Sequence, residues 1–415
     1  MPVRPRSPLL PIFLIVLVDV FGLTMVIPLL ARYAENFGAS PLVATLLSSC
    51  YAACSLLSSP IIGRLSDRYG RRPLLLASQT GTLIGFLILA SANSLWLVFA
   101  GRILDGLTAG NLSLAQAYIS DHTAPENRAK AFGVIGVAFG IGFMFGPAIS
   151  GQMAHFGLHA PFLLAAAMSA TSILCTYTLL PREGAPGSAP VVDEAGAPTP
   201  PAGRRVSVFD WRVYADYFRR PGLAPLLVQF FLFQFAFSCF TQNFVLFAER
   251  RFVHDGKPWG PAEVGWLFAY SGFLGIILQG GLIGRLVKRF GEARLVLAGF
   301  LATATAYVLL GFAMTVIALV VVATVASFGN GVLRPVITSG ITQAVGRHEQ
   351  GVVLGLSQSL GSIAMTLAPP AGGALIGRGW LGAWAFVCAG VSALGLALAS
   401  TTRRPTAETA HEQPA

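Results

Sequence analysis

The sequence predicts an all-α membrane protein with twelve transmembrane helices in two six-helix repeats. Of its 415 residues, 54% are hydrophobic and 11% are charged, whereas a soluble domain carries roughly a quarter charged residues. Long stretches lack any charge, and a motif that begins at Gly63 recurs at Gly284. This composition excludes a disordered chain and an ordinary soluble enzyme. The net charge of +10 comes from short Arg and Lys clusters between apolar stretches, so no nucleic-acid partner is expected.

The twelve predicted spans follow from length, because a helix needs about 20 apolar residues to cross a bilayer. Stretches without Asp, Glu, Lys or Arg cover 36–63, 73–101, 131–181, 221–248, 264–284, 295–333, 350–377 and 379–402. The stretch 131–181, and the stretch 295–333 extended past Arg334, each have room for two helices. Adding 9–31 and 96–119 gives twelve. Only helices can satisfy the backbone of so many segments in lipid.

Lys and Arg residues in the loops orient these spans. With a cytoplasmic amino terminus, the basic residues of the inner loops outnumber those of the outer loops roughly four to one. We therefore expect a multi-pass protein of the inner (plasma) membrane with both termini in the cytoplasm.

The chain divides into four predicted parts: a six-helix bundle over 1–180, a cytoplasmic linker with an amphipathic helix over 181–221, a second six-helix bundle over 222–402, and a cytoplasmic tail over 403–415. The linker is rich in Pro and Gly. Gly63–Gly70 and Gly284–Gly291 are identical at five of eight positions, which indicates that the bundles repeat each other. Two such repeats are typical of transporters that work by alternating access.

Charged residues within the predicted spans are few and therefore informative. Asp19 lies about ten residues into the first span, about 15 Å along its axis. Arg102 and Asp105 lie one turn apart in the fourth span. An ionised carboxylate at this depth is costly, so we expect Asp19, Asp105 or both to carry a coupled proton, with Arg102 stabilising the ionised Asp105. Alternatively, Arg102 and Asp105 only neutralise each other as a structural pair.

The sequence Gly-Arg-Leu-Ser-Asp-Arg-Tyr-Gly-Arg-Arg-Pro, which begins at Gly63, resembles the signature loop between spans 2 and 3 of the major facilitator superfamily. A positively charged cytoplasmic loop would explain the arginines but not the glycines or the single acid. The resemblance implies that this loop is a gate, in which Asp67 bonds arginines and a facing helix end in one conformer only. The predicted gating residues are Gly63, Asp67, Arg68, Gly70, Arg71 and Arg72.

Residues 138–151 resemble the antiporter motif of drug/proton exporters in this superfamily. Its positions here are Gly142, Gly146, Pro147 and Gly151, and Ser150 stands where a second glycine is usual. Glycines four residues apart predict close helix packing whatever the function. The export direction rests on the resemblance alone.

The group most resembled is that of the tetracycline/proton antiporters. In this superfamily spans 1, 4, 7 and 10 line the central cavity, which implies a set of cavity residues: Asp19, Gln116, Gln229, Gln234, Gln242, Asn243 and Arg334. Tetracycline exporters are expected to carry acids in spans 3 and 9, but residues 74–92 and 295–313 contain no charge. The cavity, which Phe residues of span 7 would line, should therefore suit neutral, zwitterionic or anionic apolar compounds better than a cationic metal–tetracycline complex.

We expect a secondary active transporter that exports a small organic compound or drug in exchange for protons. Its expected partners are that substrate, protons and the bilayer, and we expect it to work as a monomer. A proton-coupled importer of a polar or anionic solute is the alternative. A membrane receptor or an enzyme is the alternative of another class, but no constellation of nucleophile and base is visible. No P-loop is visible, so drive by ATP is not expected. No cofactor or metal is expected, and the proton gradient is the expected driving force.

Overall fold

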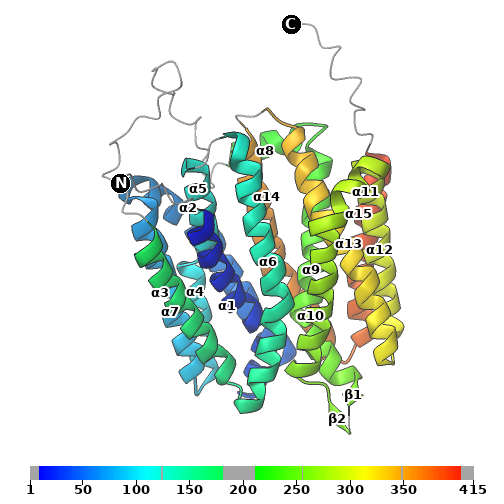
Figure 1. Ribbon diagram of the computed structural model, residues 1–415. Helices are drawn as coiled ribbons and strands as arrows, with labels where there is room; N and C mark the ends of the chain where they lie inside the picture. The colour runs from blue at the N-terminus through cyan, green and yellow to red at the C-terminus, as the bar shows by residue number, and fades with distance from the viewer. Residues whose placement is uncertain (1–8, 123–124, 181–210, 255, 347–348, 403–415) are drawn as a thin grey trace, which may run out of the picture.

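The computed structural model describes residues 9–122, 125–180, 211–254, 256–346 and 349–402, and these are almost entirely helical (Figure 1). The first half comprises α1 (Leu9–Glu35), α2 (Pro41–Tyr69), α3 (Arg71–Ser91), α4 (Leu95–Leu107), α5 (Asn111–His122), α6 (Pro125–Met153), the short 3₁₀ turn η1 (Ala154–Phe156) and α7 (Ala160–Leu179). The second half comprises α8 (Trp211–Arg219), α9 (Ala224–Arg251), the hairpin strands β1 (Val253–His254) and β2 (Lys257–Pro258), α10 (Pro261–Ile277), the π-helical turn η2 (Leu278–Leu282), α11 (Ile283–Phe290), α12 (Glu292–Phe312), α13 (Val316–Gln343), α14 (Gln350–Gly377) and α15 (Leu381–Thr401).

Eleven of the described helices are long and apolar enough to cross a membrane. The twelfth predicted span is not one helix: α4 and α5 follow each other with a break at Thr108–Gly110. Ser78 of α3 closes this break, because its hydroxyl bonds the Thr108 carbonyl and accepts from the Gly110 amide at 2.9 Å. Together α4 and α5 cover the expected fourth span.

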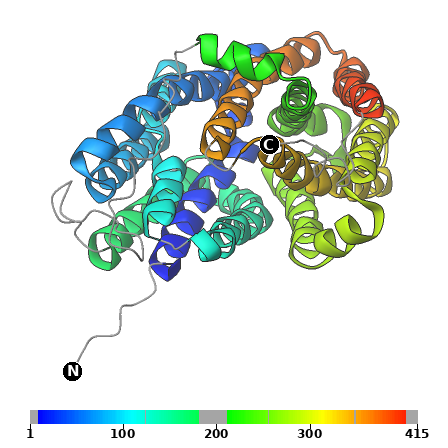
Figure 2. The same cartoon turned by 90° about the horizontal axis from the view of Figure 1, so that it is seen from above.

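The helices run up and down between two ends of the molecule (Figure 1). We call the end where α1 begins and α15 ends the termini side, and the end that carries β1 and β2 the hairpin side. Seen from above, α1–α7 form one group and α9–α15 the other (Figure 2). The groups meet where α6 packs on α10 and α2 packs on α14. The predicted linker lies mostly outside the described residues, and α8 is the part of it that is described.

The internal repeat predicted from the sequence is visible in the backbone. α2 ends at Gly70 with φ +91° and α3 begins directly after it; α11 ends at Gly291 with φ +76° and α12 follows. Only glycine adopts such angles without strain. The stretch Gly63–Tyr69, expected as part of a loop, is therefore the helical end of α2, and the turn is the single residue Gly70.

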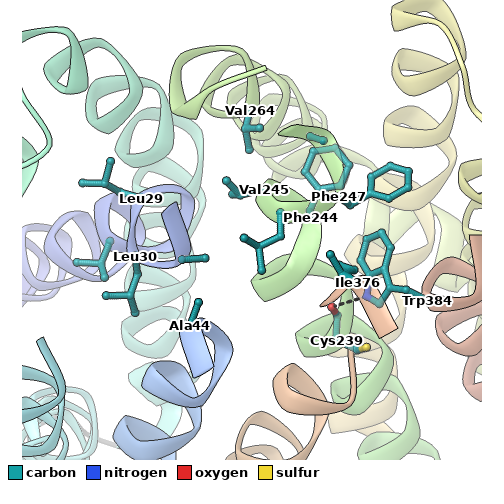
Figure 3. Close-up of a cluster of buried hydrophobic side chains, with 14 of the residues drawn as sticks. Leu29, Leu30, Ala44, Cys239, Phe244, Val245, Phe247, Val264, Ile376 and Trp384 are labelled. Carbon is teal, nitrogen blue, oxygen red and sulfur yellow. Dashed lines mark hydrogen bonds between the residues drawn. The ribbon is translucent and has the colours of Figure 1, made fainter. Parts of the chain in front are cut away.

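The two halves are closed against each other on the hairpin side. One buried apolar cluster there contains Leu29 and Ala44 from the first half and Val245 and Val264 from the second (Figure 3). Two ion pairs add to it at the ends of α1 and α9, Arg32 with Glu249 and Glu35 with Arg250.

Toward the termini side, the buried apolar residues form two separate clusters. One contains residues of the first half, such as Ile15 and Tyr118, and the other contains residues of the second half, such as Phe300 and Val332. This conformer is therefore closed on the hairpin side, and among the described residues the halves share no buried apolar cluster toward the termini side.

Candidate functional site

Two adjoining cavities lie between the halves, with volumes of about 330 Å³ and 550 Å³. Seven residues line both of them: Ile27, Phe139, Phe143, Gln234, Phe237, Thr241 and Arg334. They therefore form one continuous site with two compartments, which we call the polar cavity (330 Å³) and the aromatic cavity (550 Å³). Both volumes fall in the range of roughly 300–1,000 Å³ that is typical of small-molecule sites.

The polar cavity brings together most of the residues predicted from the sequence. Its lining includes Asp19, Arg102, Asp105, Gln116, Gln234, Gln242 and Arg334. They come from five helices: α1, α4, α5, α9 and α13. Charged side chains are thus concentrated at the junction of the two halves, where alternating access requires the substrate to bind.

Arg102 and Asp105 form an ion pair within one turn of α4, with Arg102 Nη1 2.7 Å from Asp105 Oδ2. Both residues are almost fully buried, at 3% and 5% exposure. The Arg102 guanidinium also lies over the ring of Tyr51, 4.3 Å from its centroid. This arrangement neutralises both charges, and it leaves the pair at the edge of the cavity where a proton or substrate can reach it.

Asp19 lies ten residues after the start of α1, about 15 Å along its axis, and lines the polar cavity. Its polar neighbours are Ser172 of α7 and Asn111 of α5. Its Oδ1 atom is buried and has no hydrogen-bond partner among the described residues.

Phe side chains line much of the aromatic cavity, as expected of the Phe-rich α9. Phe233, Phe237 and Phe240 of α9 face this cavity, and Phe230 faces the polar cavity. Phe139 and Phe143 of α6 complete the aromatic walls. Three amide side chains, Gln234, Gln279 and Asn330, also line this cavity, as does Arg334.

Two predicted cavity residues, Gln229 and Asn243, lie elsewhere in this conformer. Gln229 is 1% exposed and donates to Thr402 Oγ1 at 3.3 Å. Asn243 is fully buried and donates to the carbonyls of Cys239 and Pro369, at 2.9 and 3.1 Å. Helical periodicity gives the reason: Asn243 lies nine residues after Gln234, about 180° around α9 from the cavity face.

The polar cavity also has polar lining residues that were not predicted, among them Tyr51, Asn111 and Gln358. Tyr51 of α2 stacks on Arg102, Asn111 begins α5, and Gln358 belongs to α14. Helices 2 and 11 of the twelve were not expected to contribute to the cavity. Tyr51 and Gln358 stand among small and polar residues that show no strong periodicity, so the sequence carried little signal for them.

The predicted gating residues surround the turn between α2 and α3. Asp67 Oδ1 lies 2.6 Å from Arg71 Nη1, and Arg71 also donates to Ser66 Oγ at 2.5 Å. Arg72 is buried and donates to the Tyr177 carbonyl of α7 at 2.6 Å. Arg68 is exposed, and an added Cβ at Gly63 would meet nothing within 4 Å. Arg72 thus anchors the turn to its own half, while Asp67 and Arg68 remain at its surface.

The predicted antiporter motif forms helix contacts closer than any side chain would allow. A Cβ added at Gly142 or Gly146 would lie 2.4 Å from Val20 or 2.0 Å from Thr24 of α1, and one at Gly151 would lie 2.6 Å from the Pro261 carbonyl of α10. Thr24 donates to the Gly142 carbonyl at 2.9 Å. Pro147 lies within α6, and its carbonyl abuts Gly265. The motif therefore packs α6 against its own half on one face and the opposite half on the other.

On the termini side, an ion pair ties the start of α9 to the start of α14. Arg220 donates to both carboxylate oxygens of Glu349, at 2.8 and 2.9 Å. These hydrogen bonds lower the pKa of Glu349. Both groups are more than a third exposed, so solvent screening keeps the contribution of the pair to stability small. The adjacent His348 lies outside the described residues.

Among the described residues, no group of three His, Cys, Asp or Glu side chains could hold a metal ion. The described cysteines are unpaired and lie within helices.

Comparisons with known proteins find similarity over nearly the whole chain. The sequence profile of the Major Facilitator Superfamily matches residues 12–278 and 253–415. The tetracycline resistance protein, class C, of Escherichia coli is 32% identical over 370 residues, which cover 88% of this chain and 89% of that protein. Solute carrier family 67 member A1 of Homo sapiens is 30% identical over 360 residues, 84% of this chain and 81% of that protein.

Solved structures share the fold at lower sequence identity. The human organic anion transporter MFSD10 (TETRAN) superposes with a TM-score of 0.71 at 23% identity, covering 96% of this chain and 100% of the other. A bacterial homologue of the human lysosomal transporter Spinster, in an inward-facing and unoccupied conformation, gives a TM-score of 0.73 at 15% identity, covering 96% and 97%.

Proposed function

Because the chain belongs to the major facilitator superfamily, we propose that it is a proton-coupled exporter of small organic compounds that works by alternating access. The observation that carries this proposal is the polar cavity between the halves. Two acids, Asp19 and Asp105, line it together, and the halves share a buried apolar cluster on the hairpin side, whereas the described residues toward the termini side form separate clusters.

Asp19 and Asp105 are the proposed proton carriers. The Oδ1 atom of Asp19 has no hydrogen-bond partner among the described residues. Asp105 is ion-paired with Arg102, whose Nη1 atom lies 2.7 Å from Asp105 Oδ2. In this proposal, proton and substrate occupy the site in turn: Arg102 stabilises the ionised Asp105 while substrate is bound, and protonation of Asp105 from the opposite compartment accompanies substrate release. Closure on the termini side exposes both acids to that compartment. Asp67 biases which side is open, through contacts that the two conformers do not share.

The proposed location is the inner membrane of a bacterium, with the termini side in the cytoplasm. Relatives that are tetracycline resistance proteins of bacteria support the location, and the distribution of Lys and Arg supports the orientation. The transporter is proposed to act as a monomer, driven by the proton gradient without a further cofactor.

The second candidate function is proton-coupled import of a polar or anionic solute. Arg102 and Arg334 in the polar cavity favour it, since both can bind an anionic group. The same machinery can run in either direction, so only measured flux separates the two functions.

Inverted membrane vesicles from an expressing strain test the proposal. Acidifying the vesicle lumen should drive accumulation of a labelled substrate found by a susceptibility screen, and collapsing the pH gradient should release it. Accumulation only under the reverse gradient would establish the importer, and transport that ignores the gradient would exclude proton coupling.

A further inference from the structure

Arg334 is a cation without a counter-charge in the centre of the site. It lies nine residues before the end of α13, about 14 Å along the helix axis, and it lines both cavities. Within the described residues its guanidinium makes no ion pair and no hydrogen bond; only its main-chain carbonyl accepts, from Thr338. The side chain is exposed, and what it faces is the cavity space.

Two buried arginines of the first half, by contrast, have partners for their guanidinium groups. Arg102 pairs with Asp105 and stacks on Tyr51, and Arg72 donates to the Tyr177 carbonyl. A guanidinium stays charged at any physiological pH, and in a protein cavity it forms strong, charge-assisted hydrogen bonds with an anion. Of these arginines, Arg334 is therefore the one to which an anionic ligand can supply both a counter-charge and hydrogen bonds.

The shape of the site fixes what accompanies that charge. Arg334 stands where the polar cavity meets the aromatic cavity, and the larger compartment on one side of it is walled by Phe237 and Phe240. The amide of Gln234 lines both compartments beside it, with its Oε1 buried and without a partner. A ligand with one charged end and a planar apolar body would fill both compartments.

We propose that this site selects amphiphilic organic anions, whose acidic group binds Arg334 while the apolar body fills the aromatic cavity. The inference rests on the proposed transport function and narrows its substrate class. A carboxylate or sulfonate accepts two parallel hydrogen bonds from a guanidinium, which gives orientation as well as affinity. A cationic amphiphile of the same shape would place its positive charge beside the positive charge of Arg334, and the two would repel each other.

Binding to the purified protein in nanodiscs, without any gradient, tests this. Dansylglycine, dansylamide and dansylcadaverine carry one fluorophore with an anionic, a neutral and a cationic end. Dansylglycine should bind tightest. Arg334→Gln should weaken the binding of dansylglycine about tenfold and leave the affinity for dansylamide nearly unchanged. Arg334→Lys should bind dansylglycine more tightly than Arg334→Gln and less tightly than the parent protein.

The aromatic cavity has its own test with a matched control. A Cβ added at Gly275, which lines this cavity, meets nothing within 4 Å; the same holds at Gly390 of α15, which lines neither cavity. Gly275→Leu should therefore weaken the binding of dansylglycine severalfold and leave the binding of acetate-sized anions unaffected. The Gly390→Leu variant should bind dansylglycine with the affinity of the parent protein.

The outcomes separate this inference from the proposed function. Equal affinity for the three probes, or an equal loss for all three in Arg334→Gln, would overturn the selection of anions, even if proton-driven export of other compounds is intact. Arg334-dependent binding of dansylglycine without any proton-driven flux would support the site and refute the transport proposal.

Discussion

At the residue scale, the two acids that line the polar cavity differ in their surroundings. Asp105 has a fixed cationic partner 2.7 Å away, whereas the Oδ1 atom of Asp19 has none. Their depth in the predicted spans identified both from sequence. The positions of Gln229 and Asn243 were predicted wrongly for this conformer because residue type was weighed without the helical angle.

Asp19→Asn should abolish proton-driven accumulation while downhill exchange of substrate continues, because an amide cannot bind and release the coupled proton. Uptake into vesicles with and without an imposed pH gradient measures the two separately. Asp216→Asn, an exposed acid on α8 outside the cavity, is the control and should behave as the parent. Uphill transport that survives in Asp19→Asn would place the coupling residue elsewhere.

Asp105→Asn should destabilise the protein by about 3–5 kcal/mol, because it leaves Arg102 buried without its counter-charge. The double variant Arg102→Met with Asp105→Asn should recover most of this stability and still fail to couple transport to protons. Thermal unfolding in detergent together with vesicle uptake checks both parts. If the double variant still coupled transport to protons, Arg102 and Asp105 would be a structural ion pair only.

At the element scale, the fold depends on turns and helix contacts that only glycine permits. Gly70 and Gly291 end corresponding helices of the two halves at positive φ, and both were visible in the sequence as a repeated motif. The break between α4 and α5 was not predicted. Glycine does not interrupt α6, which runs unbroken through Gly136, Gly140 and Gly142, so a glycine alone could not mark the break at Gly110.

Gly146→Ala should destabilise the protein by about 1–3 kcal/mol, because the new methyl group would overlap Thr24 and force α6 away from α1. Gly136→Ala is the matched control on the same helix, where an added Cβ meets nothing within 4 Å. It should be neutral or slightly stabilising. Melting temperatures in detergent compare the two, and equal values would show that the motif is not a packing device.

Asp67→Asn should slow transport severalfold while membrane abundance stays near that of the parent, because the turn between α2 and α3 biases conformers and contributes little to the core. The neutral amide would weaken the contact with Arg71. Quantitative blotting and initial uptake rates test this, again with Asp216→Asn as the control. Turnover equal to that of the parent would remove Asp67 from the gate.

At the scale of the whole molecule, closure on one side and separation on the other define the conformer. The apolar cluster and the ion pairs on the hairpin side join the halves, and the cavities lie between that closure and the separate clusters of the termini side. The number of spans and the repeat followed from the sequence. Which side is closed did not, because the same residues must serve both conformers.

Expression in a sensitive bacterial host should give no substantial tetracycline resistance. Spans α3 and α12 carry no charge beyond their first turns, and Arg334 opposes a cationic metal–tetracycline complex in the cavity. Minimal inhibitory concentrations beside a class C tetracycline resistance protein as positive control measure this. A clear rise in tolerance that disappears in Asp19→Asn would show the charge argument to be wrong.

The discontinuous span has a consequence for biogenesis. α4 has 13 residues and spans about 20 Å, too short for a hydrocarbon core of about 30 Å, and it contains Arg102 and Asp105. Each such charge opposes insertion by about 3 kcal/mol at the centre of a helix. We therefore expect α4 to insert poorly as an isolated helix. We expect it to enter the membrane together with α5 and beside α3, whose Ser78 closes the break between them.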